Sequence, residues 1–352
     1  FGVMVPSARC AAAQGMNRSC WQVSCFKPLM FFPHAVFLGM PIGGDMRRWT
    51  VSQGDGISWC FSICLVVIST GVGARPLPED PLQRRCWLQH TGERTAPSLI
   101  PDPTPVTFSN LANGYAVRSP FWVEFGIQGM GVMPAGNKKE KTGHHHLLID
   151  TPLPPGVSDP LPFSETHRHF GKGQTGTVLE LPPGQHTLRL LFADYAHRPY
   201  FVFSPEIKVN VGGKRDATPA PQINAAQFEA TCRAWYQDEM TTPPRSGKAV
   251  YVKNIRDGEV LGSPFLVKLG VMGFGVAPAG SAVKDAGYFA LNVSRNGIPV
   301  SSVSLKNGET EAVLDLASGD YDLAVEFLGV DGGRLLKEEL PIAVVRKSQK
   351  RR

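Results

Sequence analysis

Six polar residues between positions 144 and 197 have the types and spacing of a metal-binding site. Imidazole is the commonest metal-binding side chain, and paired histidines on neighbouring strands commonly bind copper or zinc. A nearby carboxylate either binds the ion or accepts a hydrogen bond from a ligating imidazole. We therefore predict a copper or zinc ion as the cofactor and as a binding partner. The six candidate ligands are His144, His146, His167, His169, Asp194 and His197.

The stretch Gly143–Asp150, which reads Gly-His-His-His-Leu-Leu-Ile-Asp, is the centre of this candidate site. Successive side chains of a strand point to opposite faces, so His144 and His146 share one face. His145 shares the other face with two of the aliphatic residues that follow, and we interpret it as a partly buried, hydrogen-bonded core histidine. The alternative for the whole cluster is a polar strand face that binds no metal.

The chain contains an internal repeat. Ser119-Pro120-Phe121 recurs 144 residues later, and so does the Val132–Gly136 segment, with one substitution. After residue 175 the offset falls to 135, so the second copy lacks nine residues that the first has between Ile149 and Thr175. The mature protein is therefore predicted to consist of two copies of one module.

The second copy lacks the candidate metal ligands. At the offset of 144 residues, the positions of the histidine triplet are occupied by Tyr288, Phe289 and Ala290. At the second offset, the positions of Asp194 and His197 become glycines, and the other histidine pair falls in the shortened region. A cluster with one shared task would be lost as a set, so we predict the metal site in repeat one only.

Other histidines and methionines of repeat one have simpler interpretations. His186 follows a Pro-Pro-Gly turn and is interpreted as a turn or edge residue. Met130 and Met133 precede the histidine strand, and a thioether ligand there would favour copper. Met130 corresponds to Phe274 in the second copy, which favours a packing role.

Each copy has the pattern of about seven short strands separated by turns, which is typical of an immunoglobulin-like sandwich. We see no helical period in either copy. The predicted fold is all-β, with two tandem immunoglobulin-like β-sandwiches near residues 86–212 and 226–346. A linker, residues 213–225, connects them.

The segment before the first module resembles an export signal. Residues 46–74 contain Arg47 and Arg48, the apolar stretch Ile57–Thr70 and a small-residue cleavage pattern that ends at Ala74. These are the parts of a secretory signal peptide, which predicts an exported protein in the periplasm or outside the cell. We interpret residues 1–45 as a non-native or disordered extension. No apolar run in the mature chain is long enough to span a membrane.

Charge and cysteine content add little to this interpretation. The formal net charge is +6, but the end of the chain, from Arg346 through the basic tail 347–352, supplies five positive charges. The folded part is near neutral, so we predict no nucleic-acid partner. Cys86 and Cys232 are the two cysteines of the mature chain, and the sequence leaves open whether they form a disulfide.

Several motifs occur in the order found in one bacterial family. They are Ser-Pro-Phe, Gly-Met-Gly-Val-x-Pro-Ala-Gly, Thr142–Asp150, His169–Thr175, Leu181–Leu188 and Asp194-x-x-His197. Residues 106–211 thus resemble the exported domain-of-unknown-function family 4399 (DUF4399), and the second copy is a degenerate version that resembles its scaffold. The resemblance implies export and a β fold, and it implies no activity. Arg198 and the residues after it depart from the His and Pro that tend to follow in the family.

Three functions are compatible with the sequence. The first is an exported metal-binding protein. The second is a structural or adhesive module of the cell envelope that binds protein or glycan through Trp122, Tyr200 and Phe201, without metal. The third is a metal-dependent hydrolase. Nucleophile-elbow, phosphate-loop and zinc-protease motifs are absent from the sequence, so we do not predict an enzyme.

Overall fold

The computed structural model of the chain describes residues 75–97, 106–156 and 158–346. The predicted extension 1–45, the signal peptide 46–74 and the basic tail 347–352 lie outside these residues. None of the helices within the described ranges is long and apolar enough to cross a membrane.

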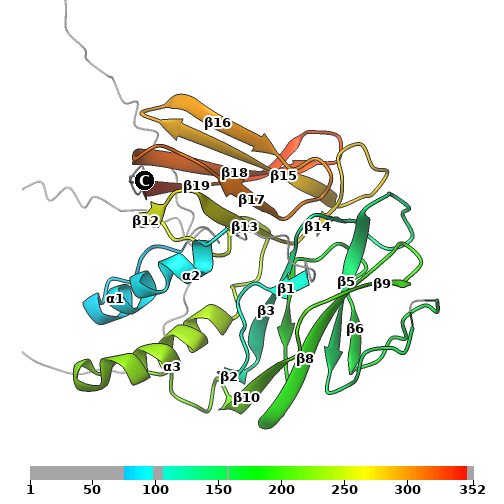
Figure 1. Cartoon of the computed structure of the whole chain (residues 1–352), viewed down its shortest axis with the longest axis horizontal. Helices are drawn as coiled ribbons and strands as arrows, with labels where there is room; N and C mark the ends of the chain where they lie inside the picture. The colour runs from blue at the N-terminus through cyan, green and yellow to red at the C-terminus, as the bar shows by residue number, and fades with distance from the viewer. Residues whose placement is uncertain (1–74, 98–105, 157, 347–352) are drawn as a thin grey trace, which may run out of the picture. The chain divides into compact units, whose positions relative to one another are not determined.

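The first repeat is a β-sandwich of a three-stranded sheet and a seven-stranded sheet (Figure 1). In the small sheet the strand order is β1-β3-β7, and in the large sheet it is β2-β10-β8-β5-β4, with β6 paired to β5 and β9 to β8. The strands are β1 (Val106–Phe108), β2 (Tyr115–Ser119), β3 (Phe121–Ile127), β4 (Gly131–Val132), β5 (Thr142–Ile149), β6 (His167–His169), β7 (Gly176–Leu179), β8 (Gly184–Ala193), β9 (Pro199–Phe203) and β10 (Ile207–Lys214).

The second repeat has the same plan. Its small sheet has the order β11-β13-β17, and its large sheet has the order β12-β19-β18-β15-β14, with β16 paired to β15. The strands are β11 (Ala249–Val252), β12 (Glu259–Gly262), β13 (Phe265–Met272), β14 (Gly275–Val276), β15 (Ala286–Arg295), β16 (Ile298–Ser304), β17 (Glu311–Leu314), β18 (Gly319–Gly329) and β19 (Arg334–Val345). The predicted fold class, two tandem sandwiches made mostly of strands, is confirmed.

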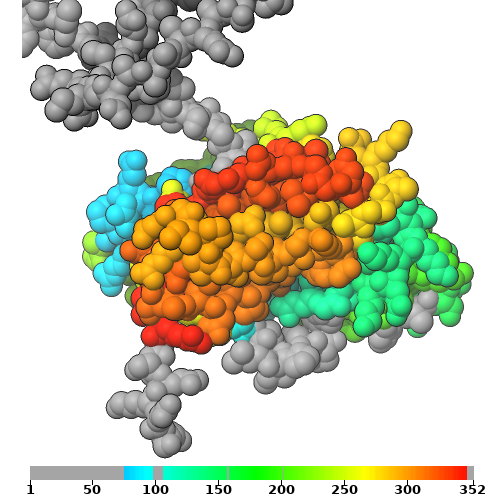
Figure 2. All heavy atoms as spheres, turned by 90° about the horizontal axis from the view of Figure 1, so that it is seen from above, coloured from blue at the N-terminus to red at the C-terminus, as the bar shows by residue number. Residues whose placement is uncertain are grey.

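Alternating apolar residues account for the core between the sheets. Phe121, Val123, Phe125 and Ile127 of β3 are buried in one apolar cluster with residues of the large sheet. This is the period-two pattern expected of a strand that faces a core. Outside the core, β16 of repeat two is an edge strand whose Ile298 is exposed, and the orange strands of this repeat lie on the face shown in Figure 2.

Three α-helices and a short 3-10 helix were not expected from the sequence. They are α1 (Pro81–Gln89), α2 (Thr91–Thr95), η1 (Ala225–Gln227) and α3 (Phe228–Thr241). The carboxylate of Asp80 caps α1 by accepting hydrogen bonds from the first amides of the helix. In α3, Phe228, Cys232 and Trp235 are buried, and their spacing of four and three residues defines one helical face. The predicted start of repeat one, at residue 86, lies inside α1.

Each helical segment packs on the repeat that it does not directly precede. Helix α2 comes before repeat one but contacts β12 and β13 of repeat two, whereas α3 comes before repeat two and contacts β2 and β3 of repeat one. A disulfide between Cys86 of α1 and Cys232 of α3, with Cα atoms 5.5 Å apart, joins the two helical segments. The helices thus tie the ends of both sandwiches together.

The two repeats also exchange backbone hydrogen bonds in a reciprocal way. The amide of Val132 donates to the carbonyl of Gly308 at 2.7 Å, and the amide of Val276 donates to the carbonyl of Gly173 at 2.8 Å. These two bonds relate corresponding positions of the repeats, since residues 132 and 276 are equivalent and so are residues 173 and 308. The contact between the repeats therefore has approximate twofold symmetry.

Two equivalent glycines make this close contact possible. A Cβ atom on Gly131 would lie 1.9 Å from the carbonyl oxygen of Asn307, and one on Gly275 would lie 1.8 Å from that of Lys172. Gly131→Ala should therefore lower the free energy of unfolding by about 1–3 kcal/mol or more, because backbone must shift to relieve the clash. Urea denaturation measures the change.

The control for this substitution is Gly262→Ala. Gly262 also lies in a strand, and an added Cβ there meets nothing within 4 Å. We expect this variant to unfold within about 1 kcal/mol of the wild type. Equal stability of the Gly131 and Gly262 variants would contradict the close approach of the two repeats.

Candidate metal centre

Strand β5 brings the histidine triplet into the middle of the large sheet of repeat one. The strand pairs with β8 and with β6, and all eight of its residues are buried. In this register His144 lies opposite Ala193 of β8, and His146 lies between Leu191 of β8 and His169 of β6. The pairing with β6 brings the second predicted histidine pair beside the first.

The inner face of β5 carries His145 into the hydrophobic core. The core location agrees with the prediction, but the ring is fully buried, with 1% of the residue exposed, and not partly buried and hydrogen-bonded. Its ring packs against Phe125 and Phe192, with centroid distances of 5.1 and 5.0 Å. Neither ring nitrogen makes a hydrogen bond of normal geometry with the described residues. Burial, reinforced by the charge of Lys253, lowers the pKa of His145 to about 3, although the carbonyl of Gly126 favours the protonated ring. His145 is therefore a neutral core residue.

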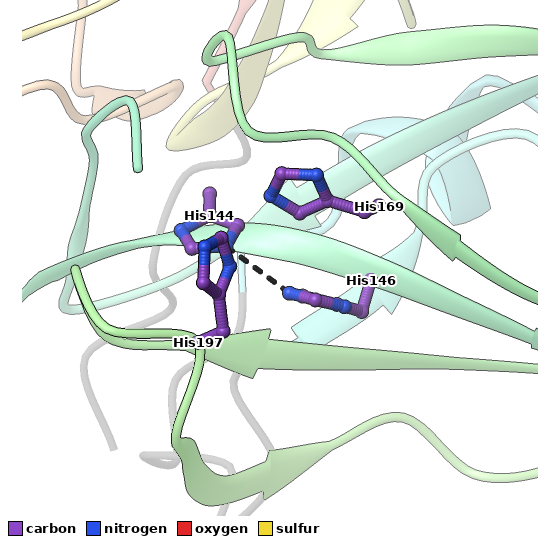
Figure 3. A group of neighbouring side chains, drawn as sticks. All are labelled: His144, His146, His169 and His197. Atoms are coloured by element: carbon purple, nitrogen blue, oxygen red, sulfur yellow. Dashed lines mark hydrogen bonds between the residues drawn. The ribbon is translucent and has the colours of Figure 1, made fainter. Parts of the chain in front are cut away.

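The outer face of β5 carries a cluster of four imidazoles (Figure 3). One ring nitrogen from each of His144, His146, His169 and His197 lies within 4.8 Å of the others. Nε2 of His144 is 3.1 Å from Nε2 of His146 and 3.1 Å from Nδ1 of His197. We call these four residues the histidine cluster.

His197 reaches the cluster from a tight turn between β8 and β9. Its backbone has a φ of 64°, in the left-handed region. The carboxylate of Asp194 stabilises this turn, because its Oδ1 accepts hydrogen bonds from the amides of Ala196 at 2.8 Å and Arg198 at 2.9 Å. Asp194 lies outside the group of four nitrogens, and in this structure it holds the turn that presents His197.

His169 reaches the cluster from β6, and a glycine leaves room for its ring. A Cβ atom on Gly171 would lie 2.3 Å from Nε2 and 2.1 Å from Cε1 of His169. Any side chain at position 171 would displace the imidazole. The absence of a side chain at Gly171 therefore helps to shape the cluster.

Burial lowers the pKa of three of the four cluster imidazoles, those of His144, His146 and His169. Burial, and then the charge that His169 and His197 carry when protonated, lowers the pKa of His144 to about 3. The same effects, with His144 as the nearest charge, lower the pKa of His146 to about 2, and burial lowers the pKa of His169. A neutral imidazole has the lone pair that a metal ion needs.

The spacing of the ring nitrogens suits a shared metal ion. A tetrahedral ion with metal–nitrogen distances of about 2.0 Å holds two nitrogens about 3.3 Å apart. Two of the nitrogen pairs in the histidine cluster are 3.1 Å apart. The Nε2 atom of His169 is buried and has no hydrogen-bond partner among the described residues, so its lone pair is also available. Two of the six nitrogen–nitrogen distances thus match a shared tetrahedral ion, and the other four are at most 4.8 Å.

The remaining candidates lie beside the cluster or away from it. The ring of His167 is buried and lies 5.5 Å from that of His146, but it does not join the group of four nitrogens. Met130 packs against the main core, and Met133 packs with Ala277 and other residues of repeat two. The donors that the structure brings together are thus all imidazoles.

Two further residues lie outside the group of four nitrogens. His186 lies in β8, where its Nδ1 is 2.7 Å from the carboxylate of Asp150, so it is a surface residue and not a ligand. Phe163, which the sequence analysis did not single out, lies with its ring centroid 4.5 Å from that of His169. The sequence feature that could have pointed to Phe163 is its location between Ile149 and Thr175, where repeat one is longer than repeat two.

The second repeat shows the same scaffold without the donors. Strand β15 pairs with β16 so that Ala290 lies opposite Ser304, as His146 lies opposite His169 in repeat one. At the place of His197, a Cβ added to Gly332 would lie 3.9 Å from the hydroxyl of Tyr288. The tyrosine therefore approaches the position that His144 and His197 share in repeat one. All four cluster histidines are replaced while the strand pairing is kept.

A family model matches both repeats. The model for Domain of unknown function (DUF4399) matches residues 123–212 and 267–340. The two matched ranges lie in the two sandwiches, and the first includes the whole histidine cluster. The resemblance to this family, with a second copy of the module, is thereby confirmed. A comparison with curated proteins finds no match.

Similar solved structures include other β proteins. The fibronectin(III)-like modules of CbhA from Clostridium thermocellum share 10% sequence identity, with 70% of this chain and 97% of that chain covered and a TM-score of 0.20. CopC from Methylosinus trichosporium OB3b shares 14% identity, with 30% of this chain and 100% of that chain covered and a TM-score of 0.20.

Proposed function

We propose that this chain, which contains two copies of the DUF4399 domain, is an exported protein that binds one divalent transition-metal ion, copper or zinc, in repeat one. The ligands are the imidazoles of the histidine cluster. The main observation in favour of this proposal is that three separate parts of the chain bring four ring nitrogens together, all within 4.8 Å of one another. A merely polar face of β5 would not require strand β6 and the turn between β8 and β9 to add histidines to it.

The donor set supports copper(II) or zinc over other common ions. Imidazole nitrogen suits zinc, copper, nickel and iron, whereas calcium and magnesium prefer oxygen ligands. Cuprous ion favours sulfur ligands, and the described cluster consists of imidazoles. Among divalent first-row metals a nitrogen site binds copper(II) most tightly. We therefore expect copper(II) to compete successfully with zinc in solution.

The disulfide supports the proposed location. Cys86 and Cys232 are joined in the structure, and such bonds persist in oxidising compartments such as the periplasm or the extracellular space. The signal-peptide pattern of residues 46–74 agrees with this location. Together they favour a protein that handles its metal outside the cytoplasm.

Metal binding can be tested by giving repeat one the residues that repeat two already has. In the double variant His144→Tyr and His146→Ala, two of four ligands are lost, and the affinity should fall at least about 100-fold, since loss of one supporting residue alone costs about 10–100-fold. Equilibrium dialysis against Cu²⁺ and Zn²⁺, followed by elemental analysis, measures the stoichiometry. We expect one ion per wild-type chain and none in the double variant.

The matched control is His186→Gln, which removes a histidine of the same repeat outside the cluster. This variant should keep one ion per chain. Metal at wild-type stoichiometry in the double variant would place the site elsewhere. If the wild-type chain binds neither Cu²⁺ nor Zn²⁺, the proposed function is rejected and the histidine cluster is only a polar structural feature.

A further inference from the structure

One aromatic side chain covers the histidine cluster. The ring centroid of Phe163 lies 4.5 Å from that of His169, 5.1 Å from that of His197 and 6.1 Å from that of His146. Phe163 is 58% exposed, whereas His144 and His146 are fully buried. The phenyl ring therefore lies between the buried imidazoles and solvent.

The chain on both sides of Phe163 is held in place. The amide of Leu161 donates to the carbonyl of His197 at 2.9 Å, and the Leu161 side chain is buried in a small apolar cluster with Leu148. On the other side, Ser164 and His167 exchange backbone hydrogen bonds of 3.1 and 3.3 Å. The position of the exposed ring is thus set by anchors two residues before it and one residue after it.

Repeat two has no counterpart of this ring. Its strands β15 and β16 are joined by Asn296 and Gly297, both with positive φ, as in a tight two-residue hairpin. Repeat one replaces this hairpin by the longer connection that contains Phe163. The aromatic ring therefore lies beside the histidines in repeat one, and repeat two has neither the ring nor the histidines.

We propose that Phe163 closes the metal centre, so that the bound ion is coordinated by the four imidazoles and is shielded from small anionic ligands and from chelators. This inference rests on the proposed function. Sites with all positions filled by protein hold their metal, whereas sites with an open position admit water or substrate. A ring that contacts three of the four imidazoles occupies the side from which an external ligand would approach.

The test uses the full chain loaded with Cu²⁺ and azide as a small anionic probe. Azide titration of the wild type should leave the visible and electron paramagnetic resonance spectra unchanged. In Phe163→Ala the spectra should change with saturable azide binding, and copper loss to excess EDTA should be at least about tenfold faster. Phe163→Tyr, which keeps an aromatic ring, should behave like the wild type.

Ile298→Ala is the control for removal of an exposed apolar side chain, because Ile298 lies in repeat two and is exposed. It should change neither azide binding nor copper release. If the wild type retains copper but Phe163→Ala shows no azide binding and no faster release, the closing role is rejected and the metal site stands. If the wild type retains no copper, the proposed function itself is rejected.

Discussion

Glu259→Gln is expected to lower the free energy of unfolding by about 3–5 kcal/mol, the usual cost of breaking a buried ion pair from one side. The carboxylate of Glu259 is fully buried and pairs with the guanidinium of Arg94. It also accepts hydrogen bonds from Thr91, from the indole of Trp87 at 3.1 Å and from the amide of Arg256 at 2.9 Å. The amide of glutamine carries no charge and donates where the carboxylate accepts, so Arg94 would remain buried without its counter-ion.

The location of Glu259 makes this substitution a test of the exchanged helices. Glu259 belongs to β12 of repeat two, and its partners Thr91 and Arg94 belong to α2, which precedes repeat one. Loss of the ion pair should release α1 and α2 from repeat two. Hydrogen exchange of the Thr91–Thr95 amides should therefore become faster, while exchange in β5 changes little.

A surface pair provides the control for Glu259. Glu339 and Lys337 form an ion pair on β19 in which both side chains are well exposed. Exposed pairs contribute about 0–1 kcal/mol, so Glu339→Gln should unfold at nearly the wild-type urea concentration. A similar small effect of Glu259→Gln would contradict the buried anchor and the packing of α2 on repeat two.

Local alternation was enough to predict how β5 is oriented. The aliphatic residues after the triplet fix which face of the strand is buried in the core, and the period of two then puts His144 and His146 on the opposite face. Alternation also predicted that His167 and His169 share one side of their own segment, whereas the register that puts His169 opposite His146 comes from the structure. Four of the six predicted candidates meet in the structure, and these four include both of the residues on β5.

The parts that were not predicted depend on contacts distant in sequence. His197 was predicted as a candidate ligand, but the left-handed turn through which it joins the cluster, and which Asp194 stabilises, was not, because no strand period indicates such a turn. Phe163 belongs to a connection without periodicity, so its contact with His169 follows only from the fold.

The helices were missed for two different reasons. The buried stripe of Phe228, Cys232 and Trp235 in α3 was visible in the sequence, and it was overlooked among the strand signals around it. The partner of each helix was not visible at all, because an amphipathic pattern shows that a face is buried and not which surface buries it. Only the tertiary contacts show that α2 packs on repeat two.

His145→Phe is expected to stabilise the metal-free protein, and more so in acid. In the folded protein the pKa of His145 is about 3, against about 6.5 in the unfolded chain. The unfolded state therefore binds more protons below pH 6.5, and stability is lost as the pH falls from 6.5 towards 3, by up to about 1.4 kcal/mol per pH unit. Phenylalanine does not titrate, so the variant should escape this loss.

Urea denaturation in EDTA at pH 7.5 and pH 5 measures both parts of the effect. At pH 7.5 the variant should gain about 1–3 kcal/mol, since two buried ring nitrogens without partners are replaced by carbon. At pH 5 the gain should be larger by about 2 kcal/mol, because the wild type loses about 1.4 kcal/mol of stability per pH unit over the about 1.5 units between pH 6.5 and pH 5. A gain that is the same at both pH values would show that His145 is not held neutral by burial.

Repeat two supplies the reciprocal experiment. Phe289 occupies the place of His145 and is fully buried, with Phe327 at a ring distance of 5.2 Å, as His145 has Phe192. Phe289→His should therefore introduce the acid sensitivity that His145→Phe removes. Because neither residue belongs to the group of four nitrogens, both variants should keep the metal stoichiometry of the wild type. This separation would show that the two faces of β5 have different tasks, the inner one in stability and the outer one in metal binding.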